Sequence, residues 1–312
     1  MKISWQGKVS LSSPDNSQFE AQPAHGEDPP SLDPQSPAPI DPAASAPAPY
    51  ISTSFPAPPV APPPIENPVW SGWDVLLIVG LTFFTILVSQ FAILFGAKYL
   101  FYRHASLSDL AQEPLLLLIS QFLIDASVAF YLFALVEGKY HVTFWNAIRW
   151  NWPRAEWKML AIGVAMLLAL SALENILPMP RDTPFDKLLE RPRDAYLLAI
   201  IAVSLGPLVE ELFFRGFFYP VLARRWGAAW AVFLTALPFA LMHMPQYGYA
   251  WGALLVVLIV GIVCGVVRAV TRSVGASFLV HVGYNGMQML IAVAVTRGFT
   301  RMPKSLLEIS FR

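Results

Sequence analysis

The chain has 312 residues, of which 55% are hydrophobic and only 13% are charged, and its mean hydropathy is +0.52. An average soluble domain is about one-quarter charged, so this composition excludes an ordinary soluble protein and indicates a membrane protein. The 21 basic residues balance 21 acidic ones, and no basic patch is available to neutralise phosphates, which excludes a nucleic-acid partner. The single cysteine, Cys264, excludes an intrachain disulfide and a metal cluster built from cysteines.

The first part of the chain differs sharply in composition from the rest, because 17 of the 28 prolines precede Trp70. Proline at this density builds neither helix nor central strand, and short Ala/Ser/Pro spacers bury too little apolar surface to fold. We therefore predict a disordered, Pro-rich tail over residues 1–69 and a multi-pass membrane domain over residues 70–312.

Seven apolar runs follow the tail, most of them roughly 18 to 25 residues long, which is enough to cross a hydrocarbon core of about 30 Å as a helix. These continuous runs lack the alternation of barrel strands, so the predicted fold is all-α: a polytopic membrane bundle of about seven to eight transmembrane helices. We expect an integral protein of a bacterial inner membrane, in contact with membrane lipid. The expected spans are residues 74–97, 114–136, 158–177, 194–222, 228–243, 251–267 and 275–295.

The fourth span contains three ionisable residues, Glu210, Glu211 and Arg215, where each would cost several kcal/mol without a partner or a function. Glu211 and Arg215 are four residues apart and share a helix face, where they can form an ion pair. Glu210 is rotated by about 100° from Glu211, so we expect one paired and one free carboxylate. Gly206–Pro207 is expected to bend the helix just before them. A purely structural salt-bridge cluster is the alternative interpretation.

Two later spans add polar side chains at similar depth. His243 ends the fifth span, and His281 and Asn285 are four residues apart on one face of the seventh. A rise of about 1.5 Å per residue places Glu210 and His243 at comparable depth, with the seventh span within reach if it tilts. A carboxylate, two imidazoles and an amide can together hydrolyse a peptide bond.

Each of these groups has a chemical role in such a site. Glu210 would take a proton from water and return it to the leaving amine, while His243 would hold the water or protonate the product. Asn285, His281 or both would stabilise the developing oxyanion. The water could be free or bound to a metal. His243 and His281, with Glu210 or Asn285, would give zinc three ligands and an open position, although Glu210 cannot serve freely as both base and ligand.

Three motifs in order along the chain resemble those of the CPBP family of intramembrane endopeptidases, which includes the CAAX prenyl proteases and bacteriocin-processing or self-immunity proteins. The motifs are Glu210-Glu211-x-x-x-Arg215, Phe239-x-x-x-His243 and His281-x-x-x-Asn285. The resemblance covers a catalytic core of about residues 194–295.

The resemblance implies a role for each motif residue. Glu210 is the water-activating group, supported by Glu211 and Arg215. The remaining catalytic groups would be His243, His281 and Asn285. It also implies a membrane-associated peptide or protein substrate, lipidated or not, and an enzyme that is either a zinc metalloprotease or activates water directly through Glu and His.

Two other classes of protein compete with a peptidase. The first is a non-proteolytic immunity or scaffold protein that keeps the same residues as a buried polar network. The second is a transporter or proton pathway, suggested by Asp125 in the second span. We favour a simpler interpretation of Asp125, a protonated side chain hydrogen-bonded to its neighbours Ser120, Gln121 and Ser127, because a transporter should show inverted repeats and paired broken helices.

Three further features of the membrane domain are assigned no chemistry. Glu174 and Arg268, near span ends, are expected to be interfacial or snorkelling residues. Cys264 is expected to be a small core residue, because a buried thiol is a poor nucleophile. The pair Gly261 and Gly265 is expected to let a neighbouring helix approach closely, most simply within the bundle.

Overall fold

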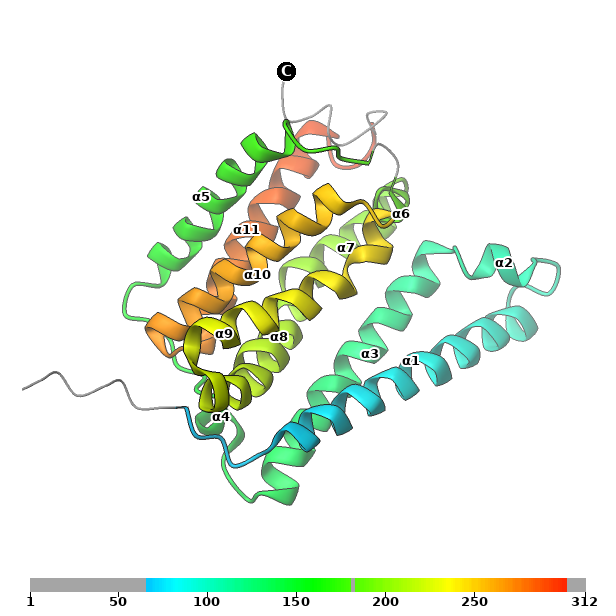
Figure 1. Ribbon diagram of the computed structural model, residues 1–312. Coiled ribbons are helices and arrows are strands. Elements are labelled where there is room, and N and C mark those ends of the chain that lie inside the picture. Colours follow the sequence, from blue (N-terminus) through cyan, green and yellow to red (C-terminus); the bar gives the residue numbers. More distant parts are fainter. Residues whose placement is uncertain (1–65, 181–182, 302–312) are drawn as a thin grey trace, which may run out of the picture. The chain divides into compact units, whose positions relative to one another are not determined.

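The computed structural model describes residues 66–180 and 183–301, and all regular structure in these ranges is helical (Figure 1). The predicted Pro-rich tail lies outside the described residues as far as residue 65. The elements are α1 (Gly72–Leu100), α2 (Leu107–Leu110), α3 (Pro114–Phe133), η1 (Ala134–Lys139), α4 (Phe144–Ala147), α5 (Glu156–Glu174), α6 (Pro184–Lys187), α7 (Pro192–Val203), α8 (Leu205–Glu211), η2 (Leu212–Phe218), α9 (Tyr219–Met242), η3 (Met244–Tyr247), α10 (Trp251–Thr271) and α11 (Val274–Val295).

Six helical stretches in the described ranges are long and apolar enough to cross a membrane. One of them, Pro192–Met242, is 51 residues long and contains two of the predicted spans, 194–222 and 228–243. Gly227 separates these two spans with φ 80° and ψ 169°, a conformation that a residue with a side chain rarely adopts. The prediction of an all-α membrane bundle is confirmed.

The helix that carries the carboxylate pair is bent just before them, as predicted. Pro207 has no N–H to donate to the carbonyl of Val203, and α7 ends at Val203. Ser204 then leaves helical geometry with φ −121° and ψ −80°, and α8 starts at Leu205. The π-helix η2 follows α8 directly, and such segments are rare and often found at functional sites.

Close packing through glycine joins the long helices in pairs. Gly261 and Gly265 of α10 face α9, where a Cβ on Gly261 would lie 3.2 Å from the Cβ of Ala236, so the predicted in-bundle contact is present. The pair α5 and α11 is closer still. A Cβ on Gly283 would lie 2.4 Å from the carbonyl oxygen of Leu160. The backbones of α5 and α11 therefore touch, and they run side by side in Figure 1.

The first two long helices form an antiparallel pair, α1 with α3, on one side of the bundle (Figure 1). The hydroxyls of Thr85 and Tyr131 lie 2.7 Å apart, and Ser120 donates to Gln90 at 3.2 Å. Large apolar side chains of α1, such as Phe83 and Phe84, are exposed on its outer surface. Such a surface is suited to lipid rather than to water.

The segment just ahead of α1 is anchored to the bundle. Glu66 Oε1 accepts hydrogen bonds from Arg149 and Arg268, both at 3.0 Å. Trp70 donates Nε1–H to the carbonyl of Phe217 at 2.8 Å, and the two rings stack. Residues 66–70 therefore contact η2, where the sequence indicated only the end of a tail.

Arg268 does not behave as predicted. Arg268 is only 1% exposed, so its side chain does not extend outward to the interface as a snorkelling side chain would. It pairs with Glu66, and its Nε donates to the carbonyl of Arg215 at 3.1 Å. The prediction was wrong because the counter-ion lies about 200 residues away in sequence, ahead of α1.

Candidate active site

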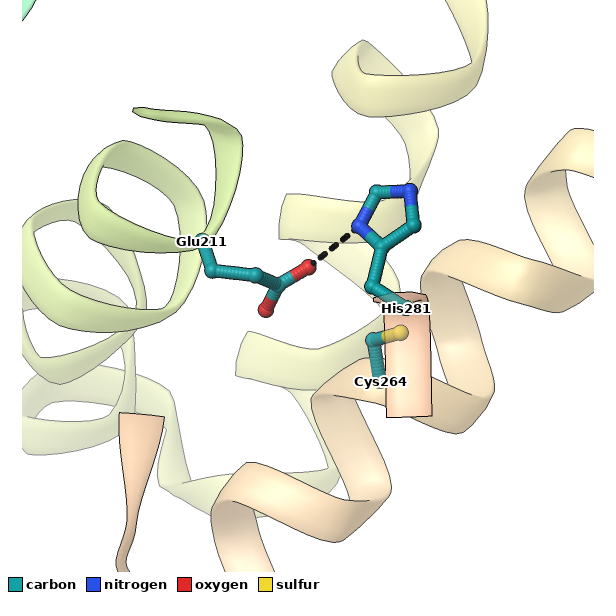
Figure 2. Close-up of side chains that lie close together, drawn as sticks. All are labelled: Glu211, Cys264 and His281. Carbon is teal, nitrogen blue, oxygen red and sulfur yellow. Dashed lines mark hydrogen bonds and ion pairs between the residues drawn. The ribbon is translucent and has the colours of Figure 1, made fainter. Parts of the chain in front are cut away.

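Glu211 is completely buried, and both of its carboxylate oxygens accept hydrogen bonds. Oε1 accepts from Arg215 at 2.9 Å and faces His281 Nδ1 at 3.0 Å, and Oε2 accepts from the Ser277 hydroxyl at 2.5 Å. Figure 2 shows the contact between Glu211 and His281, with the sulfur of Cys264 close by. The predicted ion pair with Arg215 is present, and Glu211 has no oxygen left for chemistry.

Arg215 is fixed on three sides. Besides Glu211, it donates Nη2–H to the carbonyl of Gly261 at 2.7 Å and lies 4.7 Å above the ring of Phe239. The absence of a side chain at Gly261 brings α10 close enough to offer that carbonyl. Arg215 thus balances the charge of Glu211 without reaching the second carboxylate.

Glu210 is the free carboxylate of the pair. Its Oε1 lies 3.8 Å from His243 Nε2, and its Oε2 lies 3.7 Å from His281 Nε2. Its side chain is 19% exposed, whereas that of Glu211 is fully buried. The end of α9 and the middle of α11 therefore bring the two predicted histidines to opposite oxygens of one carboxylate.

The partners of the other ring nitrogens define how these histidines can act. His243 Nδ1 lies 2.7 Å from the carbonyl oxygen of Phe239, and His281 Nδ1 faces the Glu211 carboxylate. Both partners are acceptors, so each Nδ1 carries the hydrogen, and this assigns the lone pair of the neutral ring to Nε2. Each Nε2 lies within 3.8 Å of an oxygen of Glu210.

Asn285 lies one turn beyond His281 on α11. It donates Nδ2–H to the carbonyl of Ala202 at 2.8 Å, just before the break at Ser204. That contact uses one of the two amide hydrogens. The helix break therefore holds the amide in place and leaves a second N–H for another acceptor.

A cavity of about 730 Å³ joins these groups, with Glu210, His243, His281 and Asn285 in its wall. It lies between the α1–α3 pair and the later helices, since residues of both contribute to the lining. Tyr247 of η3 also lines it, and burial raises the pKa of this phenol to about 12, which keeps it protonated at neutral pH. The cavity is large enough for a segment of peptide.

Asp125 also lines this cavity, and its surroundings differ from the prediction. Gln121 donates to its Oδ1 at 2.8 Å, as expected. The two serines do not contribute, because Ser120 donates to Gln90 and Ser127 donates to the carbonyl of Leu123 in its own helix. The prediction of hydrogen bonds from both serines to Asp125 was wrong, because each serine has another acceptor closer to its hydroxyl.

The structure offers two places to consider for a metal ion. Glu211, Cys264 and His281 have ligand atoms within 4.8 Å of one another, but the Glu211 oxygens already accept hydrogen bonds and a guanidinium lies 2.9 Å away. A cation does not fit there. Glu210, His243 and His281 are residue types that bind zinc, with the two Nε2 atoms 3.8 and 3.7 Å from the Glu210 oxygens, but the described residues do not bring all three ligand atoms within 4.8 Å of one another.

Two residues that support the site were not predicted. Ser277 lies one helical turn before His281, and that spacing could have indicated it, but serine is common in membrane helices. Glu66 accepts a hydrogen bond from Arg268, and Arg268 also donates to the backbone carbonyl of Arg215. No pattern in the sequence links a glutamate in a Pro-rich segment to a distant helix.

Part of the chain is similar to a known protein family. Residues 192–287 match the family model described as "Type II CAAX prenyl endopeptidase Rce1-like". The matched segment contains the six predicted site residues, so the predicted resemblance to this family is confirmed for residues 192–287. Searches of curated proteins and of solved structures found no match.

Proposed function

We propose that this chain, which carries a type II CAAX prenyl endopeptidase domain at residues 192–287, hydrolyses a peptide bond of a membrane-associated substrate with a water activated by Glu210. The observation that carries the proposal is the difference in surroundings between the two adjacent carboxylates. Glu211 has both oxygens bonded within the bundle, whereas the oxygens of Glu210 face two histidines inside the cavity.

The orientation of the histidines supports a specific sequence of steps. The Nε2 lone pair of one histidine can accept a hydrogen bond from a water held beside Glu210. Glu210 accepts the other hydrogen of this water and removes it as the water oxygen attacks the carbonyl carbon. The amide of Asn285 is the remaining neutral donor in this set and would stabilise the oxyanion. Glu210 then returns the proton to the leaving amine.

The same residues could also hold a metal. A zinc ion would be bound by His243 and His281 with Glu210 or Asn285, and it would lower the pKa of a bound water. In either case Glu211 and Arg215 act on the site indirectly, through the orientation of His281 and the balance of buried charge. We propose a bacterial inner membrane as the location and a peptide or protein, with or without a lipid, as the substrate.

Purified protein in lipid nanodiscs tests the assignment. Wild type would be compared with Glu210→Gln, His243→Ala and His281→Ala on fluorogenic peptides with prenylated and unprenylated members. We expect each change to lower kcat by about 10²- to 10⁴-fold, as loss of a general base or its partner does. His104→Ala, at an exposed position outside the cavity, is the matched control and should keep full activity.

Two further arms separate the alternatives. Loss of activity with a chelator and recovery with zinc would assign the water to a metal, and unchanged activity would assign it to Glu210 and the histidines alone. Full cellular function of Glu210→Gln would contradict the peptidase and favour a non-proteolytic immunity or scaffold protein.

A further inference from the structure

Asp125 is unlike every other buried carboxylate in the described part of the chain. Among residues 66–180 and 183–301, four carboxylate side chains belong to buried residues: Asp74, Asp125, Asp194 and Glu211. Three of them have a basic partner within 4.0 Å, namely Lys139 for Asp74, Arg191 and Arg193 for Asp194, and Arg215 for Glu211. Asp125 has none among the described residues.

Its second carboxylate oxygen is also without a hydrogen bond. Gln121 occupies Oδ1, but Oδ2 has no partner in the described ranges, although the residue is only 5% exposed. A buried carboxyl oxygen without a partner costs free energy whether or not the group is protonated. Asp194 Oδ2 also has no hydrogen bond, but Asp194 has two arginine partners, so Asp125 is the one of the four that lacks both a basic partner and a second hydrogen bond among the described residues. A ligand in the cavity can supply that partner.

The cavity is the route by which that partner arrives. Asp125 on α3 lines the same cavity as Glu210 on α8, so one peptide in this cavity can contact both side chains. Glu174 of α5 lines it as well, and the described lining contains no Lys or Arg side chain. With Asp186 of α6, four carboxylates from four helices line the cavity and favour a ligand that carries positive charge.

We propose that Asp125 forms a cation-binding subsite of this cavity, which takes a lysine or arginine side chain of the peptide near the bond to be cut. The proposal rests on the proposed peptidase function for the nature of the ligand. The peptide's ammonium or guanidinium group donates to Oδ2 and completes the pairing that the other buried carboxylates obtain within the chain. Asp125 thus acts in recognition and not in proton transfer.

Binding to a protein that cannot cleave tests the subsite apart from the chemistry. Labelled peptides that carry either lysine or uncharged norleucine, at each position around a central bond in turn, would be titrated against Glu210→Gln protein in nanodiscs by fluorescence anisotropy. At one position we expect lysine to bind about 10- to 100-fold more tightly, the range of a hydrogen bond to a charged group. Adding Asp125→Asn should reduce this preference to about twofold or less.

Asp109→Asn is the matched control, because it removes the same charge at an exposed position outside the cavity and should preserve the preference. No lysine preference at any position, or a preference unchanged by Asp125→Asn, would overturn the subsite. Asp125→Asn would also be made in protein that retains Glu210. If it lowered kcat equally for lysine and norleucine peptides, Asp125 would take part in the chemistry, and the subsite would be overturned. An absence of cleavage would contradict the peptidase and leave the binding result to decide the subsite.

Discussion

Glu210 and Glu211 are neighbours in sequence, yet they have different surroundings because one residue of helix turns the side chain by about 100°. Glu211 turns toward Arg215, Ser277 and the ring of His281, and Glu210 turns toward the cavity. Fixing one carboxylate with its charge balanced leaves its neighbour available for proton transfer. This contrast is the basis on which we assign the roles of the pair.

Ser277 should be important for stability although it does not line the cavity. Ser277→Ala removes the donor to Glu211 Oε2 and leaves a buried carboxylate oxygen unpaired, so we expect a loss of about 1.5–3 kcal/mol. The measurement is reversible unfolding in mixed micelles. Ser127→Ala is the control, because the hydroxyl of this half-buried serine bonds to a carbonyl of its own helix, and its loss should cost less than about 0.5 kcal/mol. Equal stability of the two variants would contradict the assigned contact.

Residues 66–70 form a brace for η2, that is, a segment whose contacts hold this π-helix in place. Trp70 holds the carbonyl of Phe217, and Arg268 links Glu66 to the backbone of Arg215. The π-helix that carries Arg215 is thus held from outside as well as by α10. Removal of the Pro-rich tail should therefore stop ahead of Glu66.

Glu66→Gln tests this brace. The change keeps the size of the side chain but leaves the buried Arg268 without its counter-ion, and loss of one member of a buried pair costs about 3–5 kcal/mol. We expect a matching fall in unfolding free energy. Glu156→Gln removes the same charge at an exposed site in the first turn of α5 and should have little effect. A Glu66 variant as stable as this control would show that the segment does not brace the bundle.

The elements themselves were largely predictable from sequence, because long apolar runs in a membrane leave few choices other than helix. The bend before Glu210 was also predictable, since Pro207 lacks the N–H that would continue α7. The contact of α5 with α11 was not, because it depends on two isolated glycines, Gly163 and Gly283, that match no spaced pattern. The pairing of Glu66 with Arg268 was not predictable either, because opposite charges can pair at any separation along the sequence.

At the scale of the whole molecule, the site depends on how closely the helices of the family-matched segment pack on those outside it. His281 lies on α11, two residues before the glycine that touches α5. The α1–α3 pair, also outside the matched segment, supplies Asp125 to the cavity. Helices beyond the matched segment therefore shape the site as well.

Gly283→Ala tests the contact between α5 and α11. Its Cβ would lie 2.4 Å from the Leu160 carbonyl oxygen, so α5 and α11 must separate, and overpacking of this kind costs about 1–3 kcal/mol. We expect a lower melting temperature and reduced activity as His281 moves. Gly286→Ala lies one turn further along α11, where the nearest atom would be 3.6 Å away, and should be tolerated. Indistinguishable variants would contradict the contact.

The most direct test of the central claim is the rate at which wild type and Glu210→Gln generate new peptide termini, measured by mass spectrometry on one peptide library in identical nanodiscs. Equal amounts of folded protein are required. The account predicts defined cleavage products with wild type and a rate at least about 100-fold lower with the variant. Products that form at the same rate with both proteins would show that Glu210 does not activate the water.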